Sequence, residues 1–227
     1  MVITPLLRGM LGIKITDGGN TVKLAPQIPI NWDDLEIRRI SAGNVLLDFT
    51  LRRENGKLTI SIARRSINSS DTKSSTHLIL APAFPFDAKV KSVSIDGQPT
   101  TFNLKRIGDI QQAEMSFDLA QPKAIVSFVY DEGTDVYLIP QTLVAGAETS
   151  GLRIIKSQAG EKGLFLSVEG AGQQTYQLNV RSTHQLQEVE GVKVKSALSG
   201  GDAQLSISFQ GAPQTYIKRE ILIPYQN

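Results

Sequence analysis

The residues that could carry out hydrolytic chemistry are few, and their spacing does not favour it. Two acidic pairs, Asp33-Asp34 and Asp131-Glu132, are the obvious candidates for the acid and base of a glycoside hydrolase. Adjacent residues on an extended chain point to opposite sides, and in turns they are usually solvated. We therefore expect both pairs to be solvated surface groups, with catalysis as the less favoured interpretation.

The histidines, serines and cysteines supply no other reaction centre. His77 and His184 are the only histidines, they lie far apart in the sequence, and neither has acidic residues at metal-ligand spacing. Ser150-Gly151 lacks the Gly-x-Ser-x-Gly pattern of a hydrolase nucleophile. Cysteine is absent, which excludes disulfides, thiolate zinc sites and a thiol nucleophile. The sequence therefore predicts no catalytic residue, no metal site and no cofactor.

Trp32 is the only tryptophan and the one candidate ligand-binding residue. Its ring could stack on a sugar, because an aromatic face suits the C–H groups of a pyranose. A tryptophan that follows Pro29 and precedes a strand more often fills the edge of a core. We expect that core role for Trp32 and keep sugar stacking as the alternative. No binding platform is predicted from the scattered tyrosines, Tyr137, Tyr176, Tyr216 and Tyr225.

Paired arginines are the most conspicuous charged feature. They lie near the ends of successive expected strands, at Arg38-Arg39, Arg52-Arg53 and Arg64-Arg65. A basic stripe for an anionic partner is one interpretation. We favour rim positions, where charges keep sheets from pairing edge to edge, with Glu36, Asp48 and Glu54 neutralising much of the field. The net charge of +2 is too small to indicate a nucleic-acid partner.

The elements that position these residues are strands. The clearest is a hairpin of residues 45–53 and 57–65 around Asn55-Gly56, because both residues of such a turn must accept positive φ. A two-residue turn pairs Leu51 with Ile60 and Phe49 with Ile62 on an apolar face. Further alternating segments predict strands at 76–80, 90–96, 113–118, 124–130, 152–157, 163–169, 175–181, 192–197, 203–209 and 215–223. Only Pro5 to Met10 is compatible with a helical turn.

Many short strands separated by turn residues are typical of sandwiches. We predict an all-β protein of two antiparallel, immunoglobulin-like β-sandwich domains in tandem, with one extended sandwich as the alternative. The boundary falls after Tyr130, giving domains at 1–130, with residues 1–20 as a lead-in, and 131–227. Residues 131–150 are expected to be irregular. No apolar run approaches the ~20 residues of a membrane span, and the N-terminus does not resemble a signal peptide, so no membrane partner is predicted and the compartment stays open.

One stretch of structural residues carries a family resemblance. The pattern is Arg8-Gly9-Met10-Leu11-Gly12-Ile13, then Val22-Lys23-Leu24-Ala25-Pro26-Gln27-Ile28-Pro29-x-x-Trp32, then the hairpin through Asn55-Gly56, and later Val93-Ser94-Ile95-Asp96-Gly97-Gln98. It resembles the β-sandwich that follows the catalytic domain in glycoside hydrolases with an α/α-toroid barrel. Glycogen debranching (amylo-1,6-glucosidase-like) and α-L-rhamnosidase-like proteins are the most similar.

The resemblance covers residues 5–130 and implies a partner and a role. In that family the Leu-Gly phrase ends the last barrel helix, and the helical barrel carries both catalytic carboxylates. No catalytic residue can be transferred to this chain, because the barrel is absent from it. The resemblance therefore implies a non-catalytic C-terminal accessory region that braces the barrel, with the parent protein a glycoside hydrolase. The alternatives are a carbohydrate-binding module that uses Trp32 and a free-standing adhesion or scaffold protein.

Overall fold

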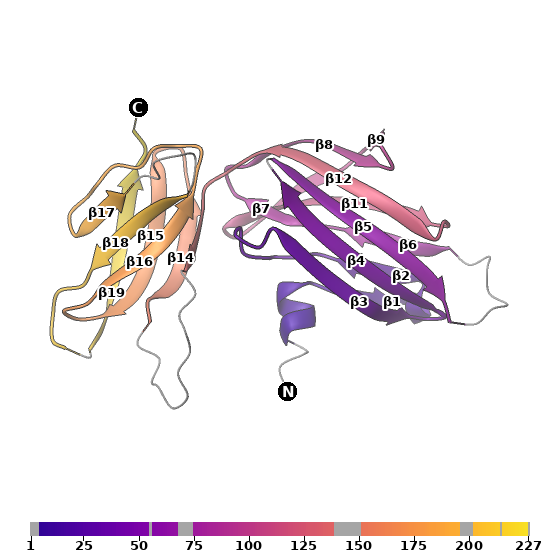
Figure 1. The fold of residues 1–227 in the computed structure, drawn as a ribbon, viewed down its shortest axis with the longest axis horizontal. Coiled ribbons are helices and arrows are strands. Elements are labelled where there is room, and N and C mark those ends of the chain that lie inside the picture. The colour runs from indigo at the N-terminus through magenta and orange to yellow at the C-terminus, as the bar shows by residue number, and fades with distance from the viewer. Residues whose placement is uncertain are drawn as a thin grey trace. The chain divides into compact units, whose positions relative to one another are not determined.

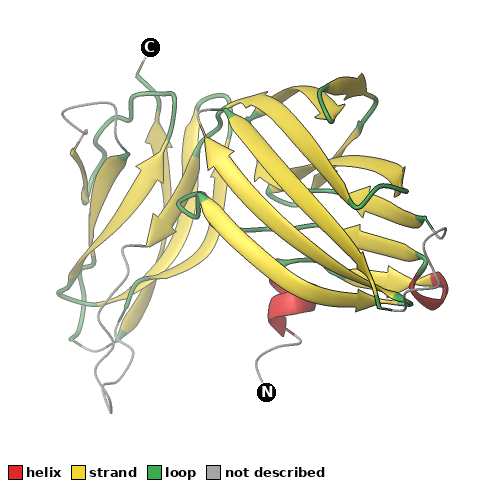
Figure 2. Ribbon diagram, turned by 45° about the vertical axis from the view of Figure 1, so that its right-hand side comes forward, coloured by secondary structure: helices red, strands yellow, loops and turns green. Residues whose placement is uncertain are grey.

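The computed structural model describes residues 5–54, 56–67, 75–138, 151–195, 202–213 and 215–226. Strands dominate these residues (Figures 1 and 2), and their two short helices are a π-helix, η1, at Pro5–Met10 and a 3-10 helix, η2, at Asp17–Gly19. The all-β prediction is therefore confirmed, and so is the helical turn expected at Pro5–Met10. The chain divides into two compact units, of which the first comprises Met1–Phe84 with Ala88–Asp131 and the second Pro85–Asp87 with Glu132–Asn227.

The first unit is built from two six-stranded sheets. One has the order β1-β2-β6-β11-β10, with β7 also paired to β11, and the other has the order β3-β4-β5-β12-β8-β9. Every pairing with a defined register is antiparallel except β2 with β6, which is parallel. The strands of the first sheet are β1 Lys14–Thr16, β2 Thr21–Leu24, β6 Thr76–Leu80, β7 Ala83–Pro85, β10 Asn103–Ile107 and β11 Ile110–Leu119. Those of the second are β3 Asp34–Ala42, β4 Val45–Glu54, β5 Lys57–Ser66, β8 Lys89–Ile95, β9 Gln98–Thr100 and β12 Lys123–Asp131.

The β4–β5 hairpin has the predicted register. Leu51 lies opposite Ile60 and Phe49 opposite Ile62, and Glu54 lies opposite Lys57 beside the turn. Gly56 has a φ of 73°, the positive value that the turn requires, whereas Asn55 lies outside the described residues. Since side chains alternate between the faces of a strand, this register places all four apolar residues on one side of the sheet.

The core of the first unit lies between its two sheets. Fully buried side chains come from both of them: Leu24, Leu78 and Leu80 from one, Phe49, Ile60 and Phe128 from the other. Burying a side chain of this size contributes about 1.5–3 kcal/mol. The two sheets therefore form a sandwich stabilised by one shared core.

The second unit has seven strands in two smaller sheets. One has the order β13-β16-β18-β17 and the other the order β14-β15-β19, and all their pairings are antiparallel. The strands are β13 Asp135–Leu138, β14 Arg153–Ala159, β15 Gly163–Ala171, β16 Thr175–Arg181, β17 Val192–Lys195, β18 Ala203–Ser208 and β19 Tyr216–Pro224. Leu164, Leu166, Leu178, Leu205 and Ile223 are completely buried in a core that the two sheets share.

The strand predictions need one correction and several additions. Part of the segment expected to be irregular forms β13, an edge strand whose four residues are too few to show a clear period. The short strands β1, β2, β7, β9 and β10 were likewise not predicted, and the strand expected after Trp32, β3, was given no range. Residues 139–150, within the same expected irregular segment, and the predicted strand end at 196–197 lie outside the described residues.

Candidate functional site

The acidic pairs and the histidines do not form a reaction centre. Asp34 accepts a hydrogen bond from Arg52 at 3.0 Å, and Asp131 pairs with Lys91 at 2.5 Å, with both carboxylates largely exposed. His77 contacts Asp118 at 2.8 Å in the first unit, whereas His184 stacks on Tyr225 in the second. Among the residues that the structure describes, no group of three or more His, Asp or Glu side chains could hold a metal ion.

The arginine pairs lie on the second sheet of the first unit, and one arginine of each pair has an acidic partner. Arg38 forms two hydrogen bonds with Glu36, at 2.6 and 2.7 Å, and Arg65 pairs with Asp48 at 2.6 Å. These contacts lower the pKa of Glu36, mainly through the hydrogen bond from Arg38. Arg52 lies near Glu54, at 3.8 Å, as well as Asp34. The expected neutralisation by Glu36, Asp48 and Glu54 is thus confirmed, and the basic stripe loses its support.

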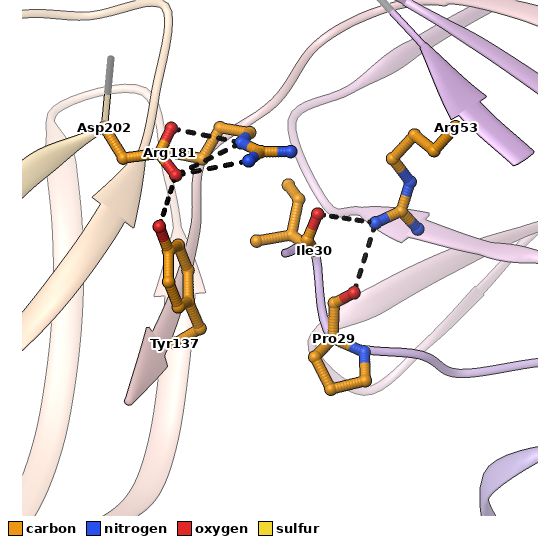
Figure 3. Close-up of polar contacts among 6 residues, drawn as sticks. All are labelled: Pro29, Ile30, Arg53, Tyr137, Arg181 and Asp202. Atoms are coloured by element: carbon orange, nitrogen blue, oxygen red, sulfur yellow. Dashed lines mark hydrogen bonds and ion pairs between the residues drawn. The ribbon is translucent and has the colours of Figure 1, made fainter. Parts of the chain in front are cut away.

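The segment Pro29–Asp33, the Trp32 loop, is fixed to the neighbouring strand β4. Arg53 donates its Nη1 hydrogens to the carbonyl oxygens of Pro29 and Ile30, at 3.2 and 2.9 Å (Figure 3). The backbone N–H of Arg53 donates to the carbonyl of Asp33 at 2.7 Å, and that of Trp32 to the carbonyl of Pro29 at 3.0 Å. The loop therefore has a defined shape, set by one cation and by turn hydrogen bonds.

The expectation that Trp32 fills the edge of the core is wrong. The residue is 41% exposed, whereas Ile30 in the same loop is only 6% exposed. Ile30 occupies the buried position that the sequence interpretation gave to Trp32. A braced loop thus presents a large aromatic side chain to the surroundings, which is the arrangement that a contact residue needs.

The segment of residues 8–13 lies against the proline-containing phrase that follows β2. The backbone N–H of Ala25 donates to the carbonyl of Leu11 at 3.1 Å, and that of Gln27 to the carbonyl of Met10 at 2.7 Å. Gly12 has a φ of 59°, and a Cβ added there would lie 2.5 Å from the carbonyl oxygen of Ala25. Only glycine satisfies both conditions, so the Leu-Gly phrase and the proline phrase interlock through the backbone.

The tyrosines that were judged too scattered for a platform all lie in the second unit, and each has a structural partner. Tyr137 donates its hydroxyl to Asp202 at 2.6 Å, and Arg181 also binds that carboxylate, at 3.1 Å (Figure 3). Burial, reinforced by the hydrogen bond to Asp202, raises the pKa of Tyr137. Tyr216 lies under the guanidinium of Arg153, 4.1 Å from its ring centroid. These contacts stabilise the unit and leave Trp32 as the exposed aromatic candidate.

A cationic groove lies beside β1 and β2 in the first unit, and sequence reasoning missed it. Its lining includes Arg8, Gly12, Ile13, Lys14, Ile15 and Lys23. Next to it, the two carboxylate oxygens of Glu114 bind Lys23 at 2.8 Å and Lys105 at 2.5 Å. The hydrogen bond from Lys105 and then that from Lys23 hold the pKa of Glu114 below its ordinary value. The sequence signal for this groove was the turn Asp17-Gly18-Gly19. Two strands joined by that turn, β1 and β2, pair Lys14 with Lys23.

The pKa of Glu114 predicts how the stability of the first unit depends on pH. Because this pKa is lowered by folding, the unfolded chain binds the proton more readily, and the carboxylate contributes stability at neutral pH. That contribution begins to be lost below the unfolded pKa of about 4.3, and it is gone once the pH has fallen through the lower folded pKa. The acid limb is the fall in the free energy of unfolding as the pH drops. We expect Glu114→Gln to make this acid limb less steep, as measured by urea unfolding followed by the fluorescence of Trp32.

The matched control is Glu54→Gln, on the other sheet, where the carboxylate is 68% exposed and 3.8 Å from Arg52. This variant should keep the wild-type acid limb. An acid limb that is equally steep in Glu114→Gln and in the wild type would contradict the assignment.

Two general findings complete the description. Neither a family model nor a curated protein nor a solved structure matches this chain. Within the described ranges, no helix has the length and the hydropathy needed to cross a lipid bilayer. The first unit offers three candidate contact features: the Trp32 loop, the interlocked residues 8–13 and the cationic groove.

Proposed function

We propose that this chain is a non-catalytic accessory region of a carbohydrate-active enzyme, and that its first unit docks onto a helical catalytic barrel. The observation that carries the proposal is the exposure of Trp32 on a loop that Arg53 holds in place. An exposed aromatic side chain on a loop whose backbone is already held suits a binding contact, because little backbone entropy is lost when it is covered. The parent enzyme in this proposal is a glycoside hydrolase of the glycogen debranching or α-L-rhamnosidase-like kind.

The interlocked backbone of the first unit supports the same role. Residues 11–13 follow η1 directly, and the carbonyls of Met10 and Leu11 accept hydrogen bonds from the phrase that leads into the Trp32 loop. The resemblance implies that the last helix of the barrel ends immediately before such a segment. The second unit, with sheets of four and three antiparallel strands, fits the proposal as an immunoglobulin-like sandwich, because constant-type immunoglobulin domains have this strand division.

The exposure of Trp32 also favours a second candidate, a carbohydrate-binding module. In that case the ring would stack on a sugar instead of a protein surface. Both candidates require a free Trp32 face, and they differ in what covers it.

Quenching of Trp32 fluorescence by acrylamide distinguishes the two candidates, because Trp32 is the only tryptophan. The partner in this test is a tryptophan-free version of the helical domain that the proposal places upstream in the same reading frame. Binding of this domain should reduce the quenching of Trp32 severalfold, whereas α-glucan oligosaccharides should leave the quenching unchanged. Trp32→Ala should weaken the association with the helical domain by about 2 kcal/mol or more, with Trp32→Phe retaining part of it.

Protection by oligosaccharides alone would replace docking with carbohydrate binding. A reading frame with no helical domain upstream would remove the accessory role altogether, since the barrel needs on the order of 400 residues to precede this chain.

A further inference from the structure

The groove beside β1 and β2 is large enough for a small ligand and is open to solvent. Its volume is about 810 Å³, and Arg8, Lys14 and Lys23 are on its lining. Ligand pockets in proteins have volumes of roughly 300–1,000 Å³. None of the six lining residues within the described part of the chain is acidic. All the charged residues named on its lining are therefore positive, whereas the arginine pairs of the other sheet lie close to acids.

The pairing of β1 with β2 places two of these cations directly opposite each other. Lys14 and Lys23 are register partners, so their side chains lie on the same face of the sheet. Like charges in this position destabilise a strand pair. An arrangement of this kind needs a compensating anion, and Glu114 supplies one to Lys23 at 2.8 Å.

The charge of Glu114 does not neutralise the groove. Its second oxygen is bound by Lys105 at 2.5 Å, so one carboxylate is shared between two ammonium groups. The other acids near these strands are engaged elsewhere, Asp17 with the hydroxyl of Thr21 at 2.7 Å and Asp118 with His77 at 2.8 Å. Over the described residues, neither Arg8 nor Lys14 has an ion-pair partner within 4.0 Å.

The other lining residues carry no charge. Ile13 packs against the core, and Ile15, which follows Lys14 on β1, is 41% exposed. Because consecutive residues of a strand face opposite ways, Ile15 and its partner Val22 lie on the face opposite to Lys14 and Lys23. The groove thus presents two cations that lack an acidic partner, at the edge strand of the sheet.

We propose that this groove binds a small ligand through an oxyanion, whose phosphate or carboxylate group contacts Arg8 and Lys14. A guanidinium binds either group through two parallel hydrogen bonds, and an ammonium adds a point charge. This inference does not depend on the accessory role, since it concerns residues that belong to the first unit itself.

Isothermal titration calorimetry of the full chain at low salt tests the proposal with four probes. These are a hexose phosphate, the corresponding hexuronate, inorganic phosphate and the neutral hexose. Saturable binding is expected for the hexose phosphate or the hexuronate, and whichever binds more tightly identifies the oxyanion. Inorganic phosphate should also bind, because the contact is made to the oxyanion itself, and the neutral hexose should not bind. Raising the salt concentration to about 0.5 M should weaken binding severalfold, because exposed charges are screened.

Variants locate the binding in the groove. Lys14→Gln and Arg8→Gln should each raise the dissociation constant about tenfold, as expected for the loss of a charged hydrogen bond. Lys14→Arg should retain most of the affinity. Lys123→Gln, which removes an exposed lysine of the opposite sheet in the same unit, is the matched control and should bind like the wild type. Urea midpoints from Trp32 fluorescence show that each variant is folded.

Three results would overturn the proposal. The first is no saturable binding of any anionic probe to the folded chain. The second is equal binding of the neutral hexose, which would show that the cations are not used. The third is an equal loss of affinity in Lys123→Gln and Lys14→Gln, which would show that binding follows the overall charge and not the groove.

Discussion

Gly12→Ala is expected to destabilise the first unit by about 3 kcal/mol or more. A residue with a side chain costs roughly 1–2 kcal/mol at a left-handed φ such as the 59° of Gly12. The added Cβ would also lie 2.5 Å from the carbonyl oxygen of Ala25, which is backbone and cannot rotate away. Relieving that contact must displace residues 8–13 from the proline phrase, so the hydrogen bond from Ala25 to Leu11 would be lost as well.

Gly108→Ala is the matched control for this prediction. Gly108 lies in the turn between β10 and β11 with a φ of 58°, almost the same as that of Gly12, but a Cβ there would meet nothing within 4 Å. It should therefore show only the conformational cost of about 1–2 kcal/mol. Urea unfolding followed by Trp32 fluorescence measures both variants, because the only tryptophan lies in the first unit. Equal destabilisation by the two substitutions would show that the interlock contributes nothing.

Phe84→Ala is expected to cost the first unit about 3–5 kcal/mol, the usual range for removing a buried phenylalanine ring. Phe84, on the short strand β7, is only 3% exposed. Its ring centroid lies 4.8 Å from that of Tyr130 and 6.0 Å from that of Phe128, both on the opposite sheet. The ring thus joins the two layers of the sandwich, and its removal leaves a cavity between them.

Phe84→Leu provides the comparison, because it keeps most of the volume and loses only the aromatic contacts. It should cost less than about 2 kcal/mol, and the same fluorescence-detected urea transition measures it. If Phe84→Ala cost no more than Phe84→Leu, the ring would not be filling the space between the sheets.

The strands that could be predicted from sequence are those with a regular alternation of apolar and polar residues. The β4–β5 hairpin was predicted to its register, because ten-residue strands with alternating apolar residues leave one way to bury Phe49 and Leu51. The strands β1 and β2, with three and four residues, have too few alternations to be recognised. The cationic groove was missed for this reason, since Lys14 and Lys23 meet only through that pairing.

Trp32 shows a different limit of sequence reasoning. The sequence correctly indicated that the Trp32 loop leads from the proline phrase into a strand. It did not show which apolar residue of the loop points inward, because irregular backbone has no fixed period. Ile30 takes the buried position, and Arg53, 23 residues further along the chain, holds the loop through backbone carbonyls that no side-chain pattern reveals.

We propose that this chain contributes binding and not catalysis, and a turnover assay of the full chain tests this proposal most directly. The purified chain should release no reducing sugar from α-glucans and no chromophore from aryl glycosides above the rate of a buffer blank. The acids that would have to act, Asp34 and Asp131, are held by Arg52 and Lys91. Robust turnover that is abolished by Asp34→Asn or Asp131→Asn would contradict the account.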